Sequence, residues 1–297
     1  MKIILPLLSV FFLACNNEPV IVQDPASEDL ISITQAFNID DQGDAITTFI
    51  INNSLNSEII YSNDSYSVNS FSNGLMVSEE IYDNNNELLA NTSYVYDASG
   101  RLTTLFNYTL DNGLEFLSYQ LEAEYAGNQI LVSKTGYDLM GEITYQDVDI
   151  FTLDNENRIM KSQDSNSANI WEATYENGNL ATFQISGYGD NYDGTATFTY
   201  SDELASEPYQ KEKYRFGSEW RNNIMLIAGG NYPFKQLAEL GNNYLTGYSF
   251  ILASNNSESV SIEVLYEFDE RGRLSKQTKN KVFFESEHNR TLTYQYE

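Results

Sequence analysis

Residues 96–102 read Tyr-Asp-Ala-Ser-Gly-Arg-Leu, and variants of this seven-residue stretch recur along the chain. An Asp at the first position of a turn accepts hydrogen bonds from turn N–H groups, and the next two residues suit a type I turn. Gly or Asn then takes a positive φ and forms the bulge that realigns the returning strand. The stretch therefore predicts a tight β-hairpin, with Arg101 on the solvent-exposed face of the sheet and Leu102 on the buried face.

The pattern occurs six times from residue 39 onward: an apolar or aromatic residue, Asp, two variable residues, Gly or Asn, usually a charged residue, then an apolar residue. The predicted turn residues are Asp40 and Gly43, Asp83 and Asn86, Asp97 and Gly100, Asp138 and Gly141, Asp154 and Asn157, and Asp269 and Gly272. Shortened relatives begin at Tyr125 and Tyr175. Each Asp has local backbone donors, so we interpret these carboxylates as turn-forming groups and not as metal ligands.

The segments beside these turns have apolar residues at every second position, the period of a half-buried strand. These positions include Leu102, Thr104, Phe106, Tyr108 and Leu110; Trp171, Ala173 and Tyr175; Ile262, Val264, Tyr266 and Phe268; and Leu292, Tyr294 and Tyr296. One hairpin after another predicts an antiparallel meander with one apolar and one polar face.

Residues 220–241 break this alternation. Asn222–Ala228 and Phe234–Leu240 lack period two, Gly229-Gly230 separates them, and Pro233 suits a helix start. The sequence therefore predicts a short helical insert in an otherwise all-β chain.

The N-terminus has the layout of a secretory signal, with a charged start, an apolar run at Ile3–Leu13 and a small residue before Cys15. The run is too short to span a bilayer as a helix. It resembles a bacterial lipoprotein signal, which implies cleavage before Cys15 and lipid on that residue; an ordinary signal peptide with an incidental Cys is the alternative. The expected organisation is a signal peptide at 1–14, a lipidated flexible tether at 15–29 and a single antiparallel β domain at 30–297.

The stretches at 96–102 and 268–274 resemble YD repeats of the RHS type. Together with the lipoprotein signal and the segment Asn231, Pro233 and Phe234, they resemble a family of Bacteroidetes lipoproteins of unknown function. That resemblance implies a porin-like rolled antiparallel sheet and supplies no catalytic residues.

A sheet of many strands can close with its apolar face inward, as a soluble barrel, or outward, as a membrane barrel. A lipid anchor is redundant for a spanning barrel, and many strands are shorter than the roughly 9–11 residues that cross a bilayer. We therefore expect an all-β antiparallel meander rolled into a soluble, porin-like barrel, with the helical insert near 220–241.

Composition excludes several classes of function. The chain of 297 residues carries 43 Asp and Glu against 16 Lys and Arg, a net charge of −27, which disfavours general nucleic-acid binding. One Cys and one His exclude a disulfide framework, a Cys-cluster zinc site and a two-His metal site within one chain. We expect no cofactor, no metal and no enzymatic activity.

Single residues give weaker evidence for a functional site than the composition gives against these classes of function. His288 reads as a residue of a charged hairpin loop, and 83–87 and 190–194 carry oxygen ligands without a full calcium-loop pattern. Trp171 and Trp220 are candidates for stacking on glycans, although aromatic residues usually pack in a core or at its rim. Two carboxylates able to hydrolyse glycosides cannot be picked out from the sequence.

These observations favour a non-enzymatic, lipid-anchored protein of the outer membrane, on its periplasmic or cell-surface face. It would act as a binding or structural module, held at the membrane through Cys15, with a glycan or another envelope protein as partner. The alternatives are a surface protein that binds or hydrolyses glycans, and a carrier that holds a lipid inside the barrel.

Overall fold

The computed structural model describes residues 30–38, 44–52, 55–61, 63–111, 113–165, 167–190, 192–205, 237–238, 241–254, 258–283 and 286–296. It contains eighteen strands. They are β1 (Leu30–Asn38), β2 (Asp44–Asn52), β3 (Leu55–Tyr61), β4 (Tyr66–Ser72), β5 (Leu75–Tyr82), β6 (Leu88–Tyr96), β7 (Leu102–Asp111), β8 (Leu114–Ala126), β9 (Gln129–Tyr137), β10 (Ile143–Leu153), β11 (Ile159–Asp164), β12 (Ile170–Glu176), β13 (Asn179–Ser186), β14 (Gly194–Leu204), β15 (Asn243–Leu252), β16 (Glu258–Phe268), β17 (Leu274–Phe283) and β18 (Ser286–Tyr296).

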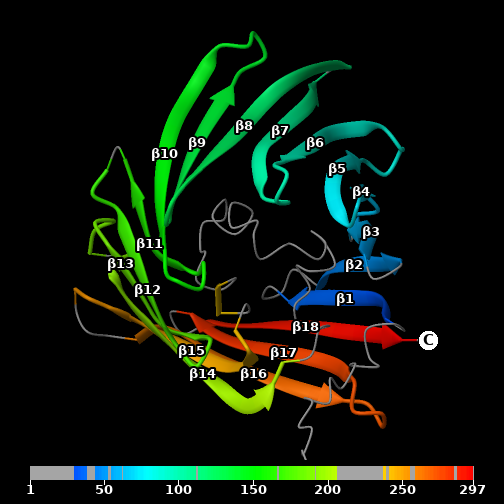
Figure 1. The fold of residues 1–297 in the computed structure, drawn as a ribbon. Helices are drawn as coiled ribbons and strands as arrows, with labels where there is room; N and C mark the ends of the chain where they lie inside the picture. Colours follow the sequence, from blue (N-terminus) through cyan, green and yellow to red (C-terminus); the bar gives the residue numbers. More distant parts are fainter. Residues whose placement is uncertain are drawn as a thin grey trace, which may run out of the picture.

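The strands form a closed antiparallel barrel (Figure 1). Each strand pairs with the next along the chain, and β18 pairs with β1 from Leu30 opposite Tyr296 to Asn38 opposite Asn289. Closure leaves no unpaired strand edge. The predicted all-β antiparallel barrel is therefore confirmed, and its strands alternate between two ends: the entry end, where β1 begins, and the far end, where the β1–β2 connection lies.

Helix is almost absent from the described part of the chain. Leu237 and Ala238 are its two helical residues, and both are buried. The rest of the predicted helical insert, 220–236 and 239–240, lies outside the described residues. No helix in the described ranges is long and apolar enough to cross a bilayer.

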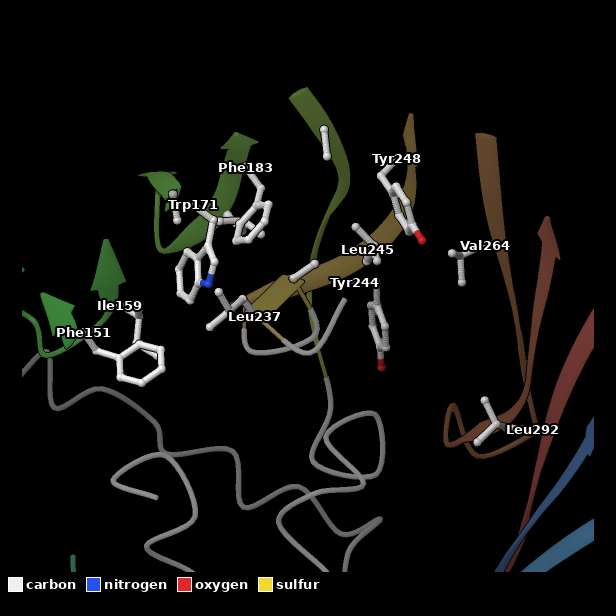
Figure 2. Close-up of a cluster of buried hydrophobic side chains, with 14 of the residues drawn as sticks. Phe151, Ile159, Trp171, Phe183, Leu237, Tyr244, Leu245, Tyr248, Val264 and Leu292 are labelled. Carbon is white, nitrogen blue, oxygen red and sulfur yellow. The ribbon is translucent and has the colours of Figure 1, made fainter. Parts of the chain in front are cut away.

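On β12 the apolar side chains point inward. In β12, Trp171 and Ala173 are buried, whereas Glu172, Thr174 and Glu176 between and after them are exposed. Figure 2 shows Trp171 and residues from the neighbouring strands on the concave side of the wall, around Leu237. The expectation that the barrel hides its aromatic face and presents polar side chains outward is met on this strand.

One predicted strand face is wrong in detail. A bulge makes Tyr96 pair with Leu102 and Val95 pair with Thr104, so Thr103 is the extra residue. Beyond it Leu105 lies opposite Leu121 on the buried side, and the side-chain parity has changed. Thr104, Phe106, Tyr108 and Leu110 therefore point to the face opposite Leu102, because a one-residue shift turns every following side chain over.

Candidate functional site

The Asp turns close as tight hairpins through their own carboxylates. In the first complete example, the N–H groups of Ser99 and Arg101 donate to Asp97 Oδ1 at 2.8 and 3.0 Å. Gly100 follows with a φ of 75° and donates its N–H to the Asp97 carbonyl at 3.0 Å. The same backbone bonds to the first Asp occur at Asp83, Asp138, Asp154 and Asp269. Asn86, Gly141, Asn157 and Gly272 supply the matching positive φ.

These hydrogen bonds favour the ionised form of Asp97, Asp154 and Asp269. Partial burial acts to raise the pKa of Asp97, but bonds from the Arg101 backbone and side chain and from Ser99 outweigh it, and the pKa is lowered. The pKa values of Asp154 and Asp269 are lowered in the same way. Because each carboxylate already accepts several protein donors, it has little capacity left to bind a ligand.

In three of these turns, an Arg that pairs with the turn Asp also contacts a Tyr ring of the next hairpin. Arg101 Nε donates to Asp97 Oδ2 at 2.7 Å, and its guanidinium lies 4.3 Å from the centre of the Tyr125 ring. Arg158 repeats this with Asp154 and Tyr175, and Arg273 repeats it with Asp269 and Tyr296. The cation is thus held between a carboxylate and an aromatic face.

The tyrosine then bonds back to the strand that leaves the turn. Tyr125 donates its OH to the Leu102 carbonyl at 2.9 Å, and Tyr175 donates to Ile159 at 2.9 Å. The same bond joins Tyr296 to Leu274, Tyr96 to Met76 and Tyr266 to Leu245. We call this arrangement the tyrosine latch. The sequence contains one indication of the tyrosine latch, because the shortened repeats begin at Tyr125 and Tyr175, which are two of the latch residues.

The Arg turns at 97, 154 and 269 and all five latches lie at the entry end. The turns at Asp83 and Asp138 lie at the far end, and they carry Glu87 and Glu142 where the other turns have Arg. The repeat is therefore one hairpin design used in two versions, of which the entry-end version fastens neighbouring hairpins together.

A second group of polar residues lies on the inner wall, on β9, β10 and β11. Lys134 forms an ion pair with Asp149, and Asp149 lies opposite Asp164 in the pairing of β10 with β11. Asp147 and Asp149 alternate with outward residues on the same parity as buried Phe151, so they face inward. We call Lys134, Asp147, Asp149 and Asp164 the inner acidic group.

Within the inner acidic group, Asp147 retains a proton more readily than a separate carboxylate does. Burial, the charge of Asp164 and its hydrogen bond, and the charge of Asp149 all raise the pKa of Asp147. Within the described ranges no cluster of three acid, His or Cys side chains is arranged to hold a metal ion.

Tyrosines surround the inner acidic group. The rings of Tyr119 and Tyr145 lie 6.4 Å apart, and Tyr145 covers Gly136, where a Cβ would meet its ring at 2.2 Å. Burial first, and then the neighbouring Tyr145 and the acids, raise the pKa of Tyr119 to about 12. Burial and the charges of the three aspartates also raise the pKa of Tyr188. Tyr145 and Tyr188 remain 50% and 46% exposed, so they offer open ring surface beside carboxylates.

The other candidates from the sequence fall in several places. Trp171 is 7% exposed and packs between Phe151 and Phe183, at 6.0 and 5.0 Å between ring centres, which leaves little ring surface for a sugar. His288 is wrongly predicted as a loop residue: it lies in β18 opposite Lys281. In the 190–194 loop, Asp193 accepts three backbone N–H groups. Cys15, Asp40, Gly43 and Trp220 lie outside the described residues.

Comparison with known proteins gives similarity of fold. No family model and no curated protein matches the chain. A porin-like protein from Bacteroides vulgatus is 10% identical over 91% of this chain and 99% of its own, with a TM-score of 0.44. A porin-like protein from Bacteroides uniformis is 13% identical over 90% of this chain and 98% of its own, with a TM-score of 0.38. A DUF3836 family protein from Bacteroides vulgatus covers 27% of this chain and 87% of its own at 16% identity, with a TM-score of 0.24.

Proposed function

We propose that this protein is a lipid-anchored, non-enzymatic barrel of the cell envelope, held at the outer membrane through Cys15 and acting as a binding or structural module. The proposal includes membership of the Bacteroidetes lipoproteins with YD/RHS-like repeats. The observation that supports it is the polar outer face of β12. A barrel that crosses a bilayer presents an apolar band to lipid, whereas β12 presents Glu172, Thr174 and Glu176 outward. A strand with this outer face is poorly suited to contact with lipid tails, and Cys15 is the point at which a lipid anchor would be attached.

The anchor is tested by metabolic labelling with radioactive palmitate and by cell fractionation. The wild type should incorporate label and sediment with outer membranes, and Cys15→Ala should lose both properties. Asn16→Ala, which leaves the lipid-accepting thiol in place, is the matched control and should behave as the wild type. Equal labelling of wild type and Cys15→Ala would refute the anchor.

A second candidate function is glycan binding at the inner wall. The observation in its favour is the open ring surface of Tyr145 and Tyr188 beside the carboxylates of the inner acidic group. Aromatic faces stack on apolar faces of sugars, and carboxylates accept hydrogen bonds from hydroxyl groups. A glycan array with a hydrolysis readout tests this. Binding should be lost in Tyr145→Ala and kept in Tyr192→Ala, a tyrosine in the same loop as Tyr188; no signal on envelope or dietary glycans would exclude it.

A further inference from the structure

The far-end turn at 138–142 differs from its copies at the two central positions. In the other described turns these exposed positions hold Asn84 and Asn85, Ala98 and Ser99, Asn155 and Glu156, and Glu270 and Arg271. Here they hold Leu139 and Met140, which are 54% and 86% exposed. A type I turn accepts almost any residue at these positions, so folding does not require an apolar pair.

The exposed apolar surface extends beyond this pair. Ile143 follows the turn at 55% exposure, and Leu114, at the tip of the neighbouring β7–β8 hairpin, is 72% exposed. We call Leu114, Leu139, Met140 and Ile143 the far-end tip. In Figure 1 the β9–β10 hairpin that carries most of it ends in a turn at the top of the picture. Exposed apolar side chains on adjacent hairpins at one end of a barrel are candidates for an interaction site.

Charge indicates the kind of partner. Asp111, Glu115, Asp138 and Glu142 flank the tip, and residues 111–115 and 137–146 contain no Lys or Arg. The whole chain carries a net charge of −27, which opposes contact with a second copy. Anionic lipid headgroups repel the same surface. A protein surface that has an apolar pocket rimmed by Lys or Arg complements both the apolar side chains of the tip and its negative charge.

The position of the tip agrees with this choice. Strand β1 begins at Leu30 at the entry end, and the turn after β9 lies at the far end. The proposed tether contains fifteen residues, and a flexible chain of that length has an average span of about 20 Å. If the proposed anchor is correct, the tip faces away from the membrane that holds the protein; this step rests on the proposed function, and the charge argument does not.

We infer that the far-end tip docks into another protein of the envelope, whose surface holds an apolar pocket rimmed by Lys or Arg. Leu139 and Met140 enter the pocket, Leu114 and Ile143 widen the contact, and Glu115 and Glu142 pair with the rim. The contact is therefore both apolar and sensitive to salt.

The test begins with photo-crosslinking in intact cells from p-benzoylphenylalanine placed at Leu139. Asn84, at the same position of the other far-end turn, carries the probe in the matched control. We expect one discrete protein adduct from position 139 and none from position 84. An absent adduct, equal adducts at both positions, or an adduct with a second copy would overturn the inference.

The cross-linked protein, identified by mass spectrometry, is then purified and titrated with the full chain and with its Cys15→Ala form. L139N/M140N copies the polar pair of the 83–87 turn and should fold normally, yet weaken binding by about tenfold or more. Raising NaCl from about 0.05 to 0.5 M should also weaken it. Adding N84L/N85M to that variant should not restore binding. Unchanged affinity in L139N/M140N, or its restoration by N84L/N85M, contradicts the inference.

Flotation with vesicles of phosphatidylethanolamine and phosphatidylglycerol covers the lipid alternative. The Cys15→Ala form should not bind the vesicles. The form that carries both Cys15→Ala and L139N/M140N should not bind them either. Vesicle binding that depends on Leu139 and Met140 would replace the protein partner by a membrane and so refute the inference. Because this form cannot be lipidated, failure of the docking site is distinguished from failure of the anchor.

Discussion

At the scale of residues, the repeated motif is one network and not a set of separate contacts. Asp97 accepts the turn N–H groups and the Arg101 guanidinium, the guanidinium covers Tyr125, and Tyr125 bonds back to Leu102. Each member fixes the orientation of the next, so the loss of one leaves its neighbours without a partner. This explains why Tyr, Asp, Gly and Arg recur together in the sequence.

The tyrosine latch predicts a graded loss of stability. Tyr125→Phe removes the bond to the Leu102 carbonyl but keeps the ring against Arg101, and should lower the unfolding free energy by about 1 kcal/mol. Tyr125→Ala also removes the ring and should cost about 3 kcal/mol. Tyr192→Phe, on an exposed loop, is the control and should stay within about 0.5 kcal/mol. Urea unfolding measures all three; equal stability of Tyr125→Phe and wild type would show that the latch does not stabilise the barrel.

The inner acidic group predicts an effect of pH with the opposite sign to that of the turn aspartates. The folded state raises the pKa of Asp147, so it binds more protons than the unfolded state between the two pKa values. Stability is therefore lost as pH rises through that range, and the loss persists at pH 7. Asp97 and Asp154 have lowered pKa values, and their contribution is lost as pH falls through those values.

Asp147→Asn removes the group that carries this penalty. It should raise the melting temperature at pH 7, and the gain should disappear below about pH 3.8, where the carboxyl is protonated in both states. Asp149→Asn breaks the ion pair with Lys134 and should give no gain at pH 7. Thermal unfolding across pH 3–8 tests this; a gain that is the same at both ends of the range would contradict the assigned cause.

At the scale of elements, the bulge in β7 decides which side chains face inward. Deleting Thr103 leaves Thr104 alone between Leu102 and Leu105, so both leucines should keep their inward face in a ladder without the bulge. We expect the deletion variant to fold, with a change in unfolding free energy of no more than about 2 kcal/mol. Thr103→Ser keeps the residue count and the hydroxyl that bonds to the Val95 carbonyl, and should remain close to wild type. Failure of the deletion variant to fold, measured by urea unfolding, would show that Thr103 is not merely the extra residue of the bulge.

The bulge also shows how far the sequence could predict this fold. Turn chemistry is local, so the sequence alone predicts the turn at Asp97 and Gly100 and the alternation of buried and exposed residues around Trp171. The sequence does not predict which face each side chain occupies after the bulge, because Thr103 has no feature that marks it as the extra residue. The inner acidic group needs the pairing of Asp149 with Asp164 across a hairpin, and the latch needs Tyr125 beside a turn more than twenty residues earlier. Both depend on register between strands, which local patterns leave open.

At the scale of the whole molecule, the barrel depends on the contact between its first and last strands. Ring closure pairs β1 with both β2 and β18, and it places buried Ile33 opposite Tyr294 and Phe49. A barrel of eighteen strands is wide, so its inner wall gains much of its packing from neighbours along the wall. Loss of one strand therefore exposes apolar residues on both sides of the gap and creates two unpaired edges.

Removal of residues 286–297, which contain β18, should cause the unlipidated protein to aggregate, because β1 and β17 then present free edges. The control removes residues 15–29, a segment of similar length that precedes β1, and should leave the barrel folded and its aggregation unchanged. Size-exclusion chromatography and β-sheet circular dichroism of unlipidated protein provide the measurements. If the variant without β18 stayed monomeric with cooperative unfolding, the remaining strands would have to close without it. The pairing of β18 with β1 would then be dispensable to the fold, contrary to the sheet order of the structure.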